Sequence, residues 1–205
     1  KADYQFNNKP YALYACDVRF QETNRPTGNI DKAKMYYSGK HKLYGVKTEV
    51  SVLPNGLAIS CSNAHNGSTS DKAMMMKNLD LHDALTRKKS DERNIQDNGE
   101  YVSMYPDHWA ILVDKGYQGC LECLQVIHPK RKPPHSVLTA EERKNNEEIS
   151  SDRVLVENYF GRLCMLWGLM KKILMEYQTA YCIYVVCCCH DKLQHYKITS
   201  MKEYF

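Results

Sequence analysis

The sequence predicts one domain of mixed α/β fold, and three observations predict it. Four short apolar runs have the length of β-strands, one strong turn signal joins two of them into an antiparallel hairpin, and the last third of the chain has helical spacing. The 205 residues allow a sizeable core, and contents of 43% hydrophobic and 25% charged residues are ordinary for a globular domain.

The first half of the chain is rich in predicted strands. Residues 11–20 form the first apolar run and predict a short buried strand. Residues 41–52 and 57–62 predict two strands, and the Pro-Asn-Gly sequence between them is a strong turn signal, so we expect a hairpin. Residues 63–70 are rich in Asn, Gly, Ser and Thr, which predicts a loop.

A helix and a further strand are expected next. Ser70 or Asp71 can cap a helix that runs from residue 72 to about residue 87. Residues 88–107 are polar and charged and predict an exposed excursion, whereas the apolar run 109–113 predicts a buried strand.

The last third is predicted to be helical after a charged insertion. Residues 129–151 form the insertion, which carries a short helix at 139–148. From Asp152 onward, apolar residues recur at steps of four, three and four. These residues are Val156, Phe160, Leu163 and Trp167. A last apolar segment, 178–190, predicts a buried helix. This order of elements is that of a ribonuclease H-like core, with a mixed sheet flanked by helices.

Three acidic residues occupy places where acids are uncommon. Asp17 interrupts the first apolar run, Asp114 follows the run 109–113, and Glu157 lies in the late helix between hydrophobic residues. Carboxylates are depleted in strands and are rarely buried unless they are paired or bind a metal. The pattern therefore indicates a metal site. The alternative is three ordinary surface acids, which is easier to accept for Glu157 than for the other two.

Five blocks of sequence carry a family resemblance. In chain order they are Ala15-Cys16-Asp17 with Arg25-Pro26, Tyr37 to Lys42, Asn66-Gly67-Ser68-Thr69-Ser70-Asp71, Leu112 to Tyr117, and Arg153 to Glu157 with Phe160-Gly161. The chain resembles the DDE transposases of the PIF/Harbinger type and their bacterial insertion-sequence relatives, over nearly all of its 205 residues.

The resemblance implies a function and a site. Asp17, Asp114 and Glu157 would be a catalytic triad that holds two Mg²⁺ ions, with Mn²⁺ able to substitute, for DNA cutting and strand transfer. The expected partners are transposon ends and target DNA, and the resemblance also allows a separate DNA-binding protein and a homo-oligomer. For a eukaryotic host, it implies the nucleus.

Two further residues are candidates with open roles. Asp71 is either a rival for the second aspartate or a helix cap that supports the site. Arg153 precedes Glu157 by one helical turn, so it could orient that carboxylate, contact a DNA phosphate, or simply form an ion pair within the helix.

The chain departs from the pattern of its bacterial relatives at three positions. Ser150 stands where they have Tyr, Cys164 where they have Lys, and Arg19 where many have Thr. The first two remove groups that could contact phosphate. An alternative function is therefore a domesticated, non-catalytic DNA-binding or scaffold protein.

Other signals are weaker. The basic run Lys130, Arg131, Lys132 could follow a DNA backbone, or it could be a solvated loop. Cys120 and Cys123 have the spacing of zinc ligands, which residues 187–190 (Cys-Cys-Cys-His) could complete, but buried thiols are the favoured interpretation.

The remaining expectations concern the setting of the chain. The net charge of +4 is compatible with nucleic acid, and the longest apolar run is too short to cross a membrane. Nine cysteines without a secretion signal favour free thiols in an intracellular protein. Because the first residue is Lys1 and not Met, we expect the chain to be part of a longer protein.

Overall fold

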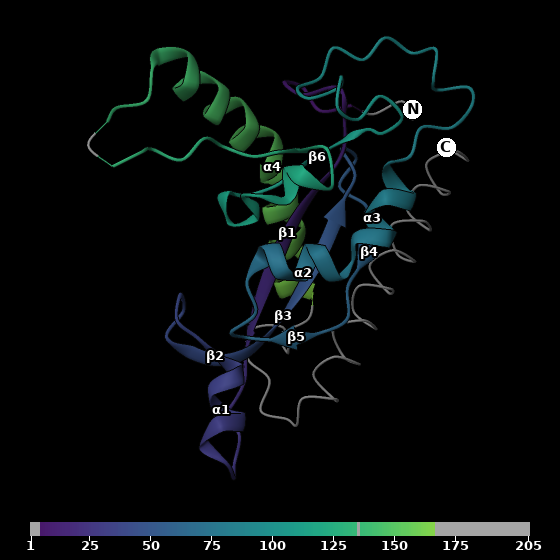
Figure 1. The fold of residues 1–205 in the computed structure, drawn as a ribbon. Helices are drawn as coiled ribbons and strands as arrows, with labels where there is room; N and C mark the ends of the chain where they lie inside the picture. Colours follow the sequence, from purple (N-terminus) through teal and green to yellow (C-terminus); the bar gives the residue numbers. More distant parts are fainter. Residues whose placement is uncertain (1–4, 135, 167–205) are drawn as a thin grey trace.

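The computed structural model describes residues 5–134 and 136–166, and the predicted helix at 178–190 and Trp167 lie outside them. The described residues form a mixed α/β fold, as predicted (Figure 1). Its strands are β1 (Ala12–Glu22), β2 (Tyr37–Ser38), β3 (Leu43–Val52), β4 (Ala58–Cys61), β5 (His65–Asn66), β6 (Ala110–Leu112) and β7 (Val126–Ile127). Its α-helices are α1 (Ile30–Tyr36), α2 (Asp71–Lys77), α3 (Leu79–Thr86) and α4 (Ala140–Leu166).

Strand β1 is the centre of the sheet, whose order is β2-β3-β1-β6-β7, with β4 and β5 also paired to β3. The β1–β3 pairing is antiparallel and continuous from Ala15 opposite Val52 to Glu22 opposite Gly45. The β1–β6 and β6–β7 pairings are parallel. The sheet is therefore mixed. Its order and directions are compatible with the ribonuclease H-like arrangement that the sequence suggested.

The predicted hairpin is confirmed. Strands β3 and β4 pair antiparallel, and the amide of Gly56 donates to the carbonyl of Leu53 at 2.8 Å to close the turn. Gly56 has φ = 81°, a left-handed conformation that glycine adopts without steric cost. The predicted loop after β4 contains one short strand, β5, which the sequence pattern did not indicate.

The prediction of a single helix at 72–87 is wrong in detail, because the chain forms two helices that meet at Asn78. Ser70 is the cap of α2, since its hydroxyl accepts from the amide of Ala73 at 3.2 Å. Asn78 leaves helical geometry, and its side chain donates to the carboxylate of Glu49 at 3.1 Å. A tertiary hydrogen bond thus accompanies the break, which local propensity cannot reveal.

The predicted insertion also needs correction, because its second half belongs to α4. The short helix expected at 139–148 and the helix expected from Asp152 are one helix of 27 residues. Asp152 ties this helix to the N-terminal segment, where its carboxylate accepts from the amides of Asn8 and Lys9 at 3.0 and 2.8 Å. The first half of α4 is polar, so the apolar spacing that marks a helix begins only later.

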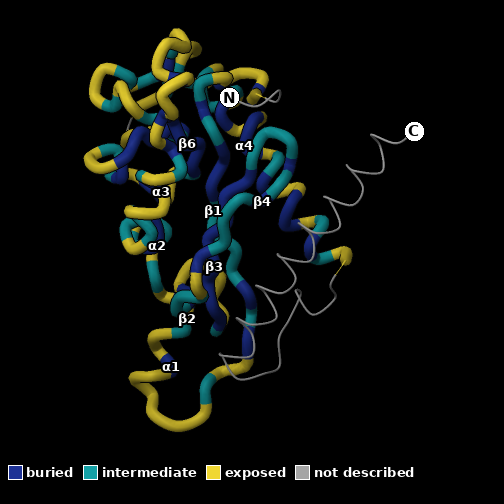
Figure 2. Tube along the Cα trace, turned by 90° about the vertical axis from the view of Figure 1, so that its right-hand side faces the viewer, coloured by how far each residue is buried: buried dark blue, intermediate teal, exposed yellow. Residues whose placement is uncertain are grey.

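Helices cover both faces of the sheet (Figure 2). One face packs against α4 through Ala15, Val50, Leu112, Val156 and other buried residues. The opposite face forms a second cluster beneath α2 and the turns after β6, with Tyr14, Cys16, Ile111, Val113 and Tyr117 among its members. Since successive strand residues point to opposite faces, β1 and β6 each contribute to both clusters.

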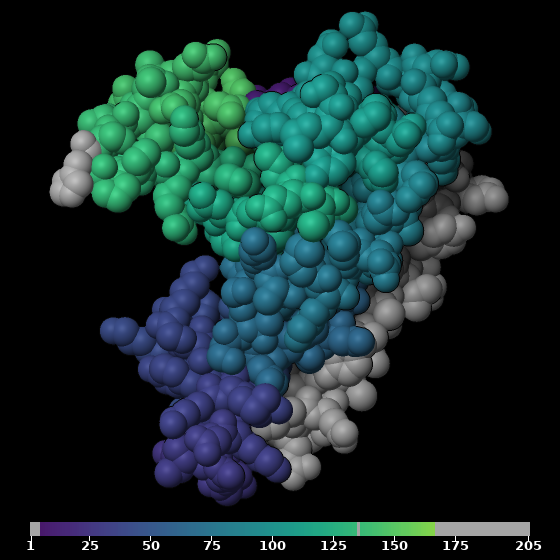
Figure 3. Space-filling view, viewed as in Figure 1, coloured from purple at the N-terminus to yellow at the C-terminus, as the bar shows by residue number. Residues whose placement is uncertain are grey.

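The excursion at 88–107 has no helix or strand, as predicted. With the residues up to 134 it covers one end of the molecule, and α1 lies at the other (Figure 3). Lys88 and Asp97 form a buried ion pair of 2.7 Å inside the excursion, which orders a segment of polar sequence. Among residues 5–134 and 136–166, none of the helices has the length and apolar character that crossing a bilayer requires.

Candidate active site

Strand alternation places Asp17 and Asp114 on the same face of the sheet. Asp17 follows Ala15 by two residues and Asp114 follows Leu112 by two, and both of those residues pack toward α4. Ala15 pairs with Leu112 in the parallel β1–β6 ladder, so Asp17 within β1 and Asp114 just after β6 lie two residues further along neighbouring strands. The parallel pairing therefore brings two carboxylates from distant parts of the chain to the same face of the sheet.

Helix α4 adds the third acid. Val156 and Phe160 are buried against the sheet, and Glu157, between them in sequence, is exposed at the margin of that contact. The three acids line one pocket of about 390 Å³, named here the acidic pocket. Its full lining is Asp17, Val18, Arg19, Phe20, Lys40, His41, Asp114, Arg153, Glu157 and Phe160. The structure thus brings all three predicted carboxylates to one cavity.

Arg153 lies between two of the acids. Its Nη2 donates to Oδ2 of Asp17 at 2.9 Å and its Nη1 donates to Oδ1 of Asp114 at 3.3 Å. The side chain of Arg153 is 7% exposed, against 22% for Asp17 and 37% for Asp114. The sequence left its partner open between Glu157, a phosphate and a helical ion pair, and in the structure the guanidinium contacts Asp17 and Asp114 instead.

Burial raises the pKa of Asp17 to about 6. The guanidinium of Arg153 and the amide of Val18, which donates to Oδ1 at 2.8 Å, act in the opposite direction. The negative charges of Asp114 and Asp71 raise the pKa further. A carboxyl that remains costly to ionise beside an arginine lies in a site that would favour an additional cation.

Asp71 lies near the acidic pocket but does not line it. Ser70, not Asp71, accepts the capping hydrogen bond of α2, and the carboxylate of Asp71 pairs with Lys47 at 3.1 Å. A Cβ on Gly116 would lie 2.5 Å from Oδ2 of Asp71, so the carboxylate packs against the turn that follows Asp114. In the structure Asp71 is therefore neither the cap of α2 nor a lining residue of the acidic pocket.

Three basic groups line the same pocket, and sequence reasoning assigned none of them to it. Lys40 and His41 come from the turn between β2 and β3, and His41 stacks on Phe20 with ring centroids 4.4 Å apart. Arg19, on β1, donates to Sγ of Cys164 at 2.8 Å. The sequence contained only a weak signal for Lys40 and His41, namely their place in the block Tyr37 to Lys42 that leads into β3.

The basic run lies elsewhere. Lys130, Arg131 and Lys132 are exposed in the loop before α4 and do not line the acidic pocket. Lys130 is engaged locally, because its ammonium pairs with Glu142 and its amide donates to Asn146 at 2.7 Å.

Two of the positions at which the sequence departs from the pattern that it resembles meet in space. The Sγ atom of Cys164 accepts the hydrogen bond from Arg19, so Arg19 carries a positive charge to the position where that pattern has a lysine. Ser150 is exposed on α4.

The next feature is the pair Cys120 and Cys123, whose spacing is that of zinc ligands. Cys120 is buried and Cys123 exposed, both are free thiols, and residues 187–190 lie outside the described part of the chain. A convergent set of metal-ligand atoms occurs instead at Cys16, Glu49 and His82. Consecutive members of this set are 33 positions apart in the sequence, so no spacing motif could have revealed them.

The fold and the acidic pocket define the chain as an α/β protein whose carboxylates gather beside its central strand, at the end of the neighbouring parallel strand. A family model described as DDE superfamily endonuclease matches residues 16–190, and the chain belongs to that family. It is thus a nuclease domain of the transposase type, for which DNA is the implied substrate. No curated protein and no solved structure matches the chain.

Proposed function

We propose that this domain cuts DNA phosphodiester bonds and transfers strands with two metal ions, as a DDE transposase of the PIF/Harbinger type on a ribonuclease H-like core. One observation carries the proposal. Asp17, Asp114 and Glu157, which are 97 and 43 positions apart, line a single pocket and come from the middle of β1, the turn after β6 and helix α4. Rigid elements hold such groups more accurately than loops do.

The donor set of the acidic pocket fits Mg²⁺. Three carboxylates are hard oxygen ligands of the kind that Mg²⁺ prefers, and Mn²⁺ accepts the same set. Asp17, Asp114 and Glu157 would hold the ions. When bound, two such ions activate the attacking oxygen and stabilise the leaving oxygen of a phosphodiester. The raised pKa of Asp17 supports the fit, because a nearby cation would offset the cost of its negative charge.

Arg153 organises the pocket. Its guanidinium reaches Asp17 and Asp114 at 2.9 and 3.3 Å and partly offsets their repulsion while no other cation is present. Its buried position in α4 leaves little room for it to meet a phosphate outside the pocket. We infer a positioning role, in which Arg153 sets the separation of the Asp17 and Asp114 carboxylates before metal and DNA arrive.

The basic rim of the pocket is suited to hold the DNA backbone. Lys40 and His41 line the same cavity as the three acids, so a phosphate that they bind would lie next to the carboxylates. Arg19 adds a cation beside Cys164. Lys130, Arg131 and Lys132 would make outer contacts that strengthen binding without positioning the reacting bond.

Nicking of supercoiled plasmid in the presence of Mg²⁺ tests the proposal. Asp17→Asn, Asp114→Asn and Glu157→Gln should each lower the rate by at least about 100-fold. Glu147→Gln is the matched control, because Glu147 is an exposed acid on the same helix. Calorimetric titration with Mg²⁺ adds a readout that does not depend on activity. Parental nicking by Asp17→Asn would overturn the triad.

The relation between Arg19 and Cys164 tests the alternative of a non-catalytic scaffold. Arg19→Thr should weaken DNA binding and nicking, and the double change with Cys164→Lys should restore part of both, because a lysine then occupies the same space. Restoration supports an active site with a relocated cation. DNA retention by the parent without any Mg²⁺-dependent cutting would favour the scaffold.

A further inference from the structure

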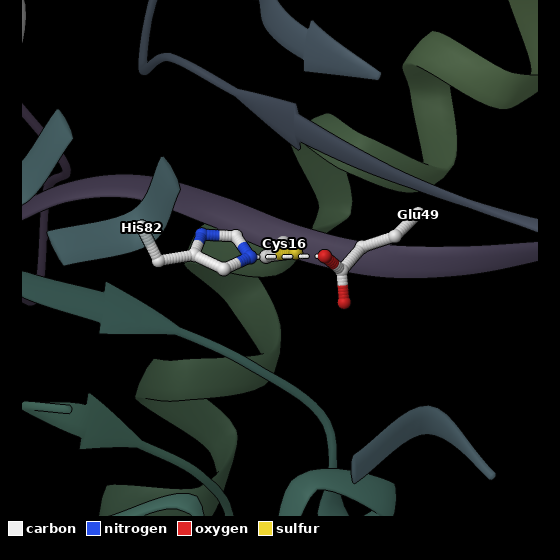
Figure 4. A group of neighbouring side chains, drawn as sticks. All are labelled: Cys16, Glu49 and His82. Atoms are coloured by element: carbon white, nitrogen blue, oxygen red, sulfur yellow. Dashed lines mark hydrogen bonds and ion pairs between the residues drawn. The ribbon is translucent and has the colours of Figure 1, made fainter. Parts of the chain in front are cut away.

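The face of the sheet opposite the acidic pocket contains a second convergence of metal-binding groups. Cys16 on β1, Glu49 on β3 and His82 on α3 each direct one ligand atom inward, and these atoms lie within 4.8 Å of one another (Figure 4). All three residues are buried, with exposed fractions of 0%, 3% and 1%. They stand on three separate elements, so no local turn brings them together.

Surrounding tyrosines orient the ligand atoms. Tyr14 Oη shares a hydrogen bond of 2.7 Å with Nδ1 of His82, which leaves Nε2 facing Glu49 and Cys16. Tyr117 Oη donates to Oε2 of Glu49 at 3.3 Å, and Oε1 faces Nε2 at 2.9 Å. Metal-binding histidines and carboxylates are commonly held in this way, with the second polar atom of each fixed by a neighbour.

A cation would stabilise the buried carboxylate of Glu49 in this cluster. In the described part of the chain, His82 is the one basic side chain that forms an ion pair with Glu49. A neutral His82 would leave a buried carboxylate with only neutral donors, which is costly away from water. A divalent ion bound by a thiolate, a carboxylate and a neutral imidazole has no net charge, and it stabilises the thiolate.

We propose that Cys16, Glu49 and His82 supply three protein ligands to a buried zinc ion. Sulfur and imidazole ligands select Zn²⁺ over the Mg²⁺ that suits the acidic pocket. Two ligand atoms bound to tetrahedral zinc at about 2.0–2.1 Å lie about 3.3 Å apart, so Nε2 and Oε1 need to separate by only a few tenths of an ångström. The ion joins β1, β3 and α3 behind the acidic pocket and becomes enclosed as the chain folds.

Metal analysis of the purified 205-residue chain tests the site. The protein is prepared without chelator, dialysed against EDTA at neutral pH, and analysed by inductively coupled plasma mass spectrometry. The parent should retain about one zinc ion per chain, whereas Cys16→Ser and Glu49→Gln should lose it. Cys123→Ser and Asp17→Asn are the controls and should keep it, since Cys123 is an exposed thiol and Asp17 belongs to the other face.

The outcomes are distinct. A folded parent without zinc would leave only a hydrogen-bonded network and overturn the proposal. Zinc kept by Cys16→Ser but lost by Cys123→Ser would overturn it in favour of the Cys120 and Cys123 pair. If the ligand variants unfold, Co²⁺ added to the apo parent decides, because a thiolate-to-cobalt charge-transfer band is expected and its absence contradicts the site. Loss of cutting with retained zinc in Asp17→Asn separates this result from the proposed function.

Discussion

At the scale of single residues, charge in the acidic pocket is incompletely balanced. Arg153 contacts Asp17 and Asp114, yet burial still raises the pKa of Asp17 to about 6. One guanidinium therefore does not offset both desolvation and the neighbouring carboxylates. This imbalance makes the site dependent on pH and on metal, and both dependences can be measured.

The raised pKa of Asp17 gives a stability that decreases with pH. Its ordinary value is 3.8, so between about pH 4 and pH 6 the folded chain binds the proton more tightly than the unfolded chain does. The contribution of Asp17 to the free energy of unfolding should thus fall through this window and stay level above it. Asp17→Asn should remove the fall and stabilise the metal-free protein at pH 7 by up to about 2 kcal/mol. Urea unfolding of both proteins between pH 4 and pH 7 tests this, and parallel pH curves would contradict it.

Removal of the central guanidinium should have the opposite effect. Arg153→Gln leaves Asp17 and Asp114 without their common partner, which should lower the free energy of unfolding by about 2–4 kcal/mol in metal-free buffer. Mg²⁺ should then raise the melting temperature of this variant more than that of the parent. The matched control is Arg143→Gln, an exposed arginine on the same helix. Equal responses to Mg²⁺ in variant and parent would speak against the positioning role.

At the scale of elements, the sequence predicted the strands and turns whose signal lies within a short stretch of residues. The hairpin follows from its turn residues, and the strand before Asp114 follows from an apolar run. The break at Asn78 did not follow, because its side chain bonds to Glu49, 29 positions away. The continuity of α4 did not follow either, because the sequence indicated a short helix at 139–148 and a separate one from Asp152, and no regular apolar spacing joins the two.

The turn after β6 gives a test at this scale. Gly116→Ala would place a Cβ 2.5 Å from Oδ2 of Asp71, so the Asp71 side chain must move, and the Lys47–Asp71 ion pair should weaken. We expect a loss of about 1–3 kcal/mol in the free energy of unfolding. Gly161→Ala is the control, because its Cβ meets nothing within 4 Å and alanine favours the helix by about 1 kcal/mol. Equal thermal denaturation of the Gly116→Ala variant and the parent would argue against the close packing of Asp71.

At the scale of the whole molecule, the sheet separates two kinds of site. The face toward α4 carries Asp17 and Asp114, and the opposite face carries Cys16 and Glu49. The three acids were predictable because each stands out against its own apolar neighbours. The cluster on the other face was not, since Cys16, Glu49 and His82 become partners only through the sheet pairing and the packing of α3.

Helix α4, which carries Arg153 and Glu157 of the acidic pocket, should be held to the sheet by its buried face. Ile149 is fully buried under the sheet, and Ile149→Ala should lower the free energy of unfolding by about 2–4 kcal/mol. Val154→Ala on the exposed side of the same helix should cost less than about 0.5 kcal/mol. Urea unfolding distinguishes the two. A similar cost for both would mean that α4 is not held by its buried face.

The alternation of side chains along β1 has a consequence for folding. Cys16 and Asp17 are adjacent, so a slip of one residue in the strand register would exchange them and present a thiol to the carboxylates and a carboxylate to the thiol's neighbours. Eight consecutive residue pairs between β1 and β3 oppose that slip, because all eight would be mismatched at once. A chain trapped in the wrong register would therefore lack both sites at once while keeping its strand content, and it would escape detection by circular dichroism.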